Sequence, residues 1–399
     1  MWDLSSTLTV LGTLGLAEAL RAHLSLERAL VRGDLPPRPE ARANLPPITV
    51  IRPVKGVDTD LAANLGAAFA HAYPGEVETL FVLDDEQDPA FPFVEAAVHR
   101  GWRHGQDVRL LLAGEPHGMT GKLHAMEVGL AEAKHDLIAF ADSDTRAPPG
   151  LLEQLVRPLL DDEKVGATFA PVVVRPGEGE PTSADVAYAL MLNGLYTPEA
   201  WAQVDSQGNL RFIMGQFMAF RRETLDVIGL RGTEGELVDD MSIGLRLSEA
   251  GFENRMIHTH LPIIERGLTW PGFMKVYERW IMFSRRGIPA DFKWPQIWRV
   301  LLFFAQLLLA ATGAALGAPL AALLGLAGAV GTGLSINALH EAAGGAPVGW
   351  RHAWVVFAVL LVSPFIFLEV MRDRKLDWRG RVYDLDSQAR LAAPTLGHR

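Results

Sequence analysis

Three long apolar runs near the carboxyl end constrain the fold of this chain more than any other feature. Residues 300–316 and 319–339 carry no charge, and 353–371 contain a single charged residue, Glu369. An α-helix rises about 1.5 Å per residue, so each run approaches the length that spans the hydrocarbon core of a bilayer. Three such helices inside a soluble protein of 399 residues would leave too little polar surface to cover them. The sequence therefore predicts transmembrane helices over 299–371.

The segments that flank these runs have compositions typical of a membrane surface. Residues 269–298 are predicted to form interfacial amphipathic helices, because aromatic residues alternate there with Arg285, Arg286 and Lys293. Indole favours the headgroup zone of a bilayer, so the four tryptophans of this segment are expected to form an interfacial belt; packing in the protein core is the alternative. They are Trp270, Trp280, Trp294 and Trp298. Residues 372–399 form a basic tail, and its lysine and arginine cluster is suited to a cytoplasmic face.

The amino end is predicted to be a membrane anchor helix over 1–32 that either spans the bilayer or lies on its surface. It has neither a basic leader nor a small-residue cleavage site, so a signal peptide is not indicated. A proline-rich linker follows over 33–47. If the central domain is cytoplasmic, three complete crossings after it would place the basic tail outside. Either one of the three runs is re-entrant or surface-lying, or the positive-inside rule is broken.

Composition excludes several classes of function. The chain has no cysteine, which rules out disulfides, thiolate zinc sites, iron–sulfur clusters and cysteine nucleophiles. Its net charge is −10, and no basic stripe interleaved with aromatic residues offsets that charge. Nucleic acid is therefore not an expected partner.

The central part of the chain, 48–268, alternates short apolar runs with helical patterns. Strands are predicted at 48–52, 79–83, 108–112 and 137–141, with helices at 60–72, 89–100 and 121–134 between them. Continuous apolar strands separated by helices indicate a mostly parallel α/β sheet covered on both faces. Ligands bind beyond the carboxyl ends of the strands in such sheets. Two acidic clusters fall at those ends.

The first cluster is Asp142-Ser143-Asp144, and the second is Asp84-Asp85. Two carboxylates spaced i, i+2 after a buried strand can both reach one hard cation, Mg²⁺ or Mn²⁺, which can bridge them to a diphosphate. Asp84 and Asp85 can accept hydrogen bonds from a nucleobase or a ribose hydroxyl. Turn and loop capping is the alternative explanation for both clusters.

Two further motifs are candidates for catalysis. An acidic stretch, 236–240, precedes a predicted helix over 241–250, and Asp240 could act as a general base. Arg279-Trp280 precedes the apolar runs; the guanidinium could stabilise a departing diphosphate and the indole could form a pocket wall. A different explanation is helix capping for the acidic stretch and an interfacial anchor for the Arg-Trp pair.

Three histidines lie near these motifs or in a predicted strand. His258 and His260 are expected to form an ordinary pair on one face of a strand rather than a metal site, and His124 lies close to the candidate Lys122.

Seven motifs occur in an order and spacing that resemble the ceramide glucosyltransferase family, from about residue 48 to residue 383. They are Arg52-Pro53-Val54-Lys55-Gly56-Val57-Asp58, Asp84-Asp85 with Asp88-Pro89, Gly121-Lys122, Asp142-Ser143-Asp144-Thr145-Arg146, Val238-Asp239-Asp240, Arg279-Trp280 and Trp378-Arg379-Gly380-Arg381. The resemblance implies a membrane-bound inverting glycosyltransferase with a GT-A catalytic domain over 48–268, facing the cytoplasm. Its donor would be a UDP-sugar, usually UDP-glucose, and its acceptor a membrane lipid such as ceramide.

The resemblance also assigns roles. Asp85, with Asp84 beside it, matches the aspartate that contacts the nucleotide, and Lys55 and Lys122 match lysines near the donor pocket. Asp142 matches the second aspartate, Asp144 completes the metal-binding pair, and Asp240 matches the presumed base. Arg279 and Trp280 match the end of the family's Q/R-x-x-R-W motif.

The chain departs from that motif at its first position. Val276 replaces the usual glutamine or arginine, and Lys275 stands one place earlier. Glycosyltransferases that modify hopanoid lipids also resemble this family, so the resemblance is compatible with a hopanoid or another lipid alcohol as the acceptor. A processive polysaccharide synthase with a related catalytic domain is a different interpretation of the same motifs. A transporter is disfavoured by the lack of charges within the apolar runs.

Overall fold

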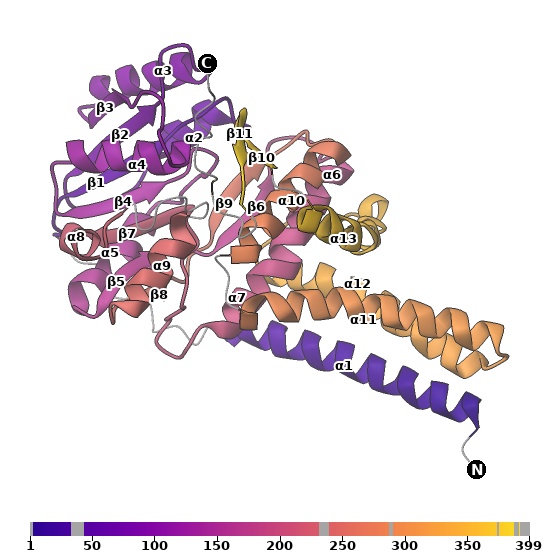
Figure 1. Ribbon diagram of the computed structural model, residues 1–399. Helices are drawn as coiled ribbons and strands as arrows, with labels where there is room; N and C mark the ends of the chain where they lie inside the picture. Colours follow the sequence, from indigo (N-terminus) through magenta and orange to yellow (C-terminus); the bar gives the residue numbers. More distant parts are fainter. Residues whose placement is uncertain are drawn as a thin grey trace.

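The computed structural model describes residues 3–32, 44–230, 239–286, 290–372, 375–386 and 391. Most of the predicted linker, 33–43, lies outside the described residues, as do 236–238 of the acidic stretch and most of the tail beyond 386. The described chain consists of a domain built around a sheet, long helices that project from it, and a small carboxyl-terminal hairpin (Figure 1).

A seven-stranded sheet forms the centre of the domain, with strand order β3-β2-β1-β4-β7-β5-β8. The first four strands run parallel, and β7 is antiparallel to both of its neighbours. The strands are β1 (Ile48–Pro53), β2 (Val77–Leu83), β3 (Asp107–Leu112), β4 (Leu137–Ala141), β5 (Val165–Phe169), β7 (Phe217–Arg221) and β8 (Glu253–Met256). The predicted mostly parallel sheet is confirmed, and the four predicted strands match β1 to β4 within two residues.

Helices cover both faces of the sheet because successive strand residues point to opposite sides. In β2, Leu80 and Val82 belong to an apolar cluster that includes α4 (Gly121–Glu132), whereas Phe81 and Leu83 belong to one with α2 (Leu61–Ala67) and α3 (Phe91–Arg103). The other helices of the domain are α5 (Leu151–Asp161), α6 (Ser183–Ala189), a π-helix (Leu190–Tyr196), α7 (Thr197–Gln203), α8 (Arg222–Ile228) and α9 (Asp239–Glu249).

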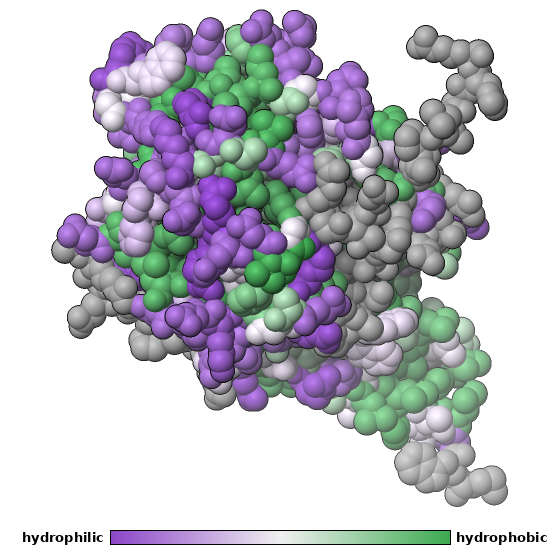
Figure 2. Space-filling view, turned by 60° about the vertical axis from the view of Figure 1, so that its left-hand side comes forward, coloured by the Kyte–Doolittle hydropathy of each residue, from purple (hydrophilic) through white to green (hydrophobic). Residues whose placement is uncertain are grey.

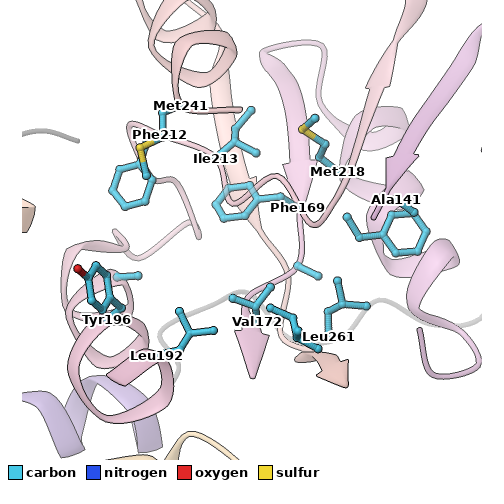
Figure 3. Packing of buried hydrophobic residues seen from close by; sticks show 14 of the residues in the cluster. Ala141, Phe169, Val172, Leu192, Tyr196, Phe212, Ile213, Met218, Met241 and Leu261 are labelled. Carbon is cyan, nitrogen blue, oxygen red and sulfur yellow. The ribbon is translucent and has the colours of Figure 1, made fainter. Parts of the chain in front are cut away.

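The larger cluster reaches from the sheet to the helices that lead to the membrane segments. Figure 3 shows Phe169 and Met218 of the sheet in the same cluster as Leu192 and Tyr196 of the π-helix. A second ribbon packs here, formed by β6 (Val172–Pro176) parallel to β9 (Leu261–Glu265). The domain and the base of the projecting helices therefore share one core.

Among the described residues, three helices are long and apolar enough to cross a membrane: Trp294–Ala315, Pro319–Ala342 and Trp350–Arg372. They contain most of α11 (Ala290–Ala315), all of α12 (Pro319–Ala342) and all of α13 (Val355–Arg372), so the predicted apolar runs are confirmed as helices. The amino-terminal helix α1 (Leu4–Arg32) is not among the three, although it lies beside α11 and α12 (Figure 1). Apolar side chains cover most of the projecting end that Figure 2 shows.

The basic tail folds into a structure that the sequence did not predict. After α13, β10 (Lys375–Trp378) and β11 (Arg381–Asp384) form an antiparallel hairpin that lies against the domain (Figure 1). Its two turn residues, Arg379 and Gly380, both have positive φ, 53° and 75°. A left-handed conformation is strained for arginine, so the hairpin holds Arg379 in an unfavourable backbone state.

The prediction that His258 and His260 lie on one face of a strand is wrong. Residues 254–261 do not form one strand: β8 ends at Met256 and β9 begins at Leu261, with a turn between them. His258 and His260 lie in this turn, and the ring of His260 packs on Trp201 with 5.7 Å between ring centroids. The β-branched and apolar residues on both sides of the turn produced the pattern of a continuous strand.

Candidate active site

The carboxyl ends of adjacent strands bring the distant motifs together. In the sheet β1 lies between β2 and β4, so the residues that follow these three strands meet at one edge. Lys55 follows β1, Asp84 follows β2 and the Asp142–Asp144 turn follows β4. A cavity of about 170 Å³ opens there, lined by residues from all three strand ends, from α4, α9 and α10 (Trp270–Arg286), and from the carboxyl-terminal hairpin.

Buried Arg52 holds the turn that carries the first acidic cluster. Its guanidinium donates to the carbonyl oxygens of Asp142 (2.8 Å) and Thr145 (3.2 Å), while the Ser143 hydroxyl donates to Asp58 Oδ2 (2.5 Å). Burial lowers the pKa of Arg52 to about 10, so it remains charged at neutral pH. The turn is therefore fixed by groups other than its two carboxylates, which line the cavity.

The carboxylates of this turn are close to cationic side chains. Lys122 Nζ lies 2.6 Å from Asp142 Oδ1, and Arg379 lies 3.8 Å from Asp144 Oδ2. Lys122 is in the first turn of α4, which begins where the backbone N–H of Leu123 donates to the side chain of Thr120. Burial, together with the negative charges of Asp142 and Asp58, raises the pKa of Asp144 to about 7.

These two carboxylates fit a hard divalent cation. Asp144 Oδ1 is buried and accepts no hydrogen bond from the described residues. No group of three or more His, Asp or Glu side chains in the described part of the chain could hold a metal ion. A cation on Asp142 and Asp144 would therefore complete its shell with water and ligand oxygens, as Mg²⁺ does when it binds through one or two carboxylates and a phosphate.

The second acidic cluster divides between the pocket and the surface. Asp84 is buried and pairs with Lys55 Nζ (2.9 Å), which also contacts Asp88 (3.0 Å). Asp85 is absent from the cavity lining and instead accepts from the backbone N–H of Gln87 (2.8 Å). Successive side chains at a strand end point in opposite directions, so only one of the two aspartates can face the pocket. Of the two predicted nucleotide-binding aspartates, the cavity lining therefore includes Asp84 and not Asp85.

Asp240 lies in the first turn of α9 and faces the same cavity. Its carboxylate accepts from the backbone N–H groups of Gly215 (2.7 Å) and Met241 (2.9 Å). Burial raises the pKa of Asp240, and the charge of Lys122 partly opposes this. A carboxylate held by two backbone donors, with a raised pKa, has the properties of a general base.

Helix α10 contributes the Arg-Trp pair. Arg279 and Trp280 both line the cavity, and Trp280 packs edge-on against Tyr196 with 5.6 Å between ring centroids. Burial lowers the pKa of Arg279. Val276 instead packs against the apolar core, and Lys275 is exposed and lies 3.8 Å from Asp377. Neither residue replaces the missing polar group within the pocket.

The hairpin supplies pocket residues that the sequence did not place there. Arg381 lies 3.1 Å from Asp84 Oδ2, and Arg379 bonds to Asp58 and to the carbonyl oxygen of Lys55. The Tyr383 hydroxyl accepts from the backbone N–H of Gly121 (3.2 Å). The motif Trp378-Arg379-Gly380-Arg381 is the sequence signal for these residues, although the composition around it is that of a basic tail.

The structure thus brings together every predicted site residue except Asp85. Those that line the cavity are Lys55, Asp84, Lys122, Asp142, Asp144, Asp240, Arg279 and Trp280. His124 is not among the lining residues; its Nε2 lies 2.9 Å from the carbonyl oxygen of Ala113. With Arg379 and Arg381, the lining holds five cationic side chains and four carboxylates, which suits an anionic ligand accompanied by a cation.

The fold is that of the GT-A glycosyltransferases, in which a mostly parallel sheet carries an acid-lined pocket at its carboxyl edge. The mannosyltransferase PcManGT from Pyrobaculum calidifontis, solved in complex with GDP-Man and Mn2+, shares this fold: the alignment covers 90% of this chain and 99% of that chain, with a TM-score of 0.50 and 20% sequence identity.

The model of glycosyl transferase family 21 matches residues 8–391, and the chain belongs to this family. It is similar to a ceramide glucosyltransferase from Candida albicans (27% identical over 120 residues, 27% of this chain and 22% of the relative). It is also similar to ceramide glucosyltransferase 1 from Caenorhabditis elegans (28% identical over 133 residues, 33% of this chain and 28% of the relative). The matched stretches thus span less than a third of these relatives.

Proposed function

We propose that this protein is an inverting glycosyltransferase that moves a hexose, glucose in the first instance, from a UDP-sugar to the hydroxyl group of a membrane lipid such as ceramide. The observation that carries the proposal is the convergence of Asp84, Asp142, Asp144 and Asp240 on one cavity. Family membership and the names of the similar relatives support a sugar donor and a lipid acceptor.

Asp240 is the general base in this proposal. It takes the proton of the acceptor hydroxyl while the oxygen attacks the anomeric carbon of the sugar, and the bond from that carbon to the diphosphate breaks. Direct attack from the face opposite the leaving group inverts the anomeric configuration. An α-linked donor therefore gives a β-glycosyl lipid.

Cationic side chains bind the nucleoside diphosphate as it leaves. Lys122, Arg279, Arg379 and Arg381 line the cavity, and arginine can contact phosphate oxygens through two N–H groups at once. A divalent cation on Asp142 and Asp144 would neutralise negative charge on the diphosphate. Asp84 is placed to accept hydrogen bonds from the nucleoside, with Lys55 fixing its carboxylate.

The cavity lining also includes apolar side chains, which we assign to the lipid acceptor. They are Met241, Trp280, Phe283 and Trp378, and Phe283 packs edge-on against Trp378. Because α10 carries both Trp280 and Phe283 and packs beside apolar α13, a lipid alcohol can reach the pocket while its chains stay in the bilayer. A catalytic domain that faces the cytoplasm would meet the soluble donor on the same side.

The test is the release of nucleoside diphosphate by purified protein supplied with UDP-glucose, UDP-galactose, UDP-N-acetylglucosamine or GDP-mannose, each with and without ceramide or a hopanoid alcohol. We expect release of UDP that depends on a lipid alcohol. A long polymer formed without lipid would identify a processive synthase instead. No release with any combination would overturn the proposal.

A further inference from the structure

The chain before α11 and the chain after α13 meet in the same pocket. Arg279 and Trp280 precede α11, whereas Trp378, Arg379 and Arg381 follow α13, and all five line the cavity. Arg381 is 3.1 Å from Asp84 of the central domain. A segment that leaves one side of a bilayer and returns to that side crosses it an even number of times. Helices α11, α12 and α13 therefore cannot all be complete crossings.

Helices α11 and α12 must cross together, because their backbones touch along their length. A Cβ atom on Gly313 would lie 2.6 Å from the backbone nitrogen of Ala322, and one on Gly325 would lie 2.6 Å from that of Ala310. Close approach at small residues is how helices associate in membranes. One of these helices could not leave the bilayer without the other.

Helix α1 joins this pair to make a three-helix bundle. Gln306 of α11 donates to the carbonyl oxygen of Gly15 (3.0 Å) and accepts from the Thr332 hydroxyl of α12 (3.0 Å). At the far end of the bundle, Leu8 packs with Ala318 and Ala321. The polar groups of Gln306 are thus satisfied between the helices, as the interior of a membrane bundle requires.

Helix α13 packs along α10 rather than along the bundle of α1, α11 and α12. Trp354, the residue just before α13, lies against Trp270 at the start of α10, with 5.9 Å between ring centroids. Further along, Ser363 of α13 shares a hydrogen bond with Tyr277 of α10 (2.9 Å). The two helices therefore run side by side. In Figure 1 the bundle of α1, α11 and α12 lies across the view, whereas α13 is seen largely end-on at the base of the bundle.

The outer face of α13 is apolar and has no cover in the described chain. Leu361, Phe365, Leu368 and Met371 recur on one side of the helix and are 44, 69, 51 and 73% exposed. Trp350, which is 84% exposed, lies just before the helix. An exposed apolar face with a tryptophan near one end is suited to contact with lipid. The orientation of α13 follows from its packing along α10 and from the even number of crossings that the shared pocket requires.

We propose that α1, α11 and α12 cross the bilayer as one bundle, and that α13 lies in the membrane surface on the side of the catalytic pocket, with its Leu361–Phe365–Leu368 face against the lipid. The amino terminus is then on the opposite side from the pocket, and the carboxyl-terminal hairpin is on the same side. This arrangement removes the parity conflict that the sequence posed. It does not depend on the proposed activity.

Labelling of single cysteines tests the topology directly, because the chain has no native cysteine. The positions are exposed: Val227 in the catalytic domain (68%), Val382 in the hairpin (64%) and Leu316 at the far end of the bundle (55%). In sealed vesicles of one orientation, a membrane-impermeant maleimide should label Val227→Cys and Val382→Cys from one side and Leu316→Cys from the other. Labelling of Val382→Cys and Val227→Cys from opposite sides would overturn the proposal.

A depth measurement tests the position of α13 itself. Phe365 is near the middle of α13, and Val330, 40% exposed, is near the middle of α12. A fluorophore on Phe365→Cys should be quenched most by lipids with a shallow nitroxide, and one on Val330→Cys by lipids with a deep nitroxide. Equal deep quenching at both positions would show that α13 crosses. Neither measurement needs turnover, so an inactive protein would refute the proposed function without affecting this test.

Discussion

Substituting Gly215 by alanine should disturb the catalytic base without touching any charged group. A Cβ atom at this position would lie 2.4 Å from Asp240 Cβ and 2.5 Å from its Oδ2. Non-bonded carbon atoms are ordinarily at least about 3.4 Å apart, so the Asp240 side chain must move by about 1 Å to make room for the added methyl group. The Gly215 N–H also donates to that carboxylate at 2.7 Å. A displacement of this size in an oriented group can cost about 100-fold in rate, or roughly 2.7 kcal/mol.

The assay for Gly215→Ala is lipid-dependent UDP release, with donor affinity and the unfolding temperature measured on the same protein. We expect kcat to fall about 100-fold while donor affinity changes little. Gly349→Ala is the matched control, because a Cβ atom there meets nothing within 4 Å. If Gly215→Ala keeps its activity within about threefold, the position assigned to the base is refuted.

Three further predictions concern charged groups of the pocket. Asp240→Asn should lower transfer by about 10³-fold or more with donor binding nearly intact, whereas the control Asp136→Asn, at a fully exposed aspartate, should not. Burial raises the pKa of Asp240, and the ionised carboxylate is the base, so wild-type activity should be lost on acidification at a pH above the ordinary pKa range of aspartate. A flat pH–rate profile down to pH about 4 would contradict this. Arg279→Lys should not restore the activity lost in Arg279→Ala, because lysine cannot make two parallel bonds to a phosphate; full rescue in the release assay would exclude bidentate contact. Asp142→Ala should abolish the part of donor binding that depends on a divalent cation, as titration calorimetry with and without EDTA would show; full activity in EDTA counts against the cation site.

Much of the catalytic domain could be predicted because its signals are local. Each of the first four strands is a short apolar run between helical patterns, and the Asp142–Asp144 turn follows directly on one of them. The order of parallel strands then places Lys55, Asp84 and Asp142 at one edge of the sheet. Neighbouring residues alone, however, did not show which of two adjacent aspartates faces inward.

The carboxyl-terminal hairpin could not be predicted because its contacts are non-local. Arg379 bonds to Asp58, more than 300 positions earlier in the chain, and composition alone assigns such arginines to a solvated tail. The position of α13 is a similar case. Its composition is that of a crossing helix, and only its neighbours Tyr277 and Trp270 on α10 show where it lies.

The structure of the lipid product is the most direct test of the central claim, that one acid-lined pocket beside the bilayer transfers a single sugar to a lipid hydroxyl. The protein is reconstituted in lipid nanodiscs with UDP-glucose and ceramide, and the lipid fraction is analysed by mass spectrometry and proton NMR. We predict a lipid heavier by one hexose, with a β-anomeric proton, that disappears with Asp240→Asn. An α-linked product, or equal product from Asp240→Asn, would contradict the account.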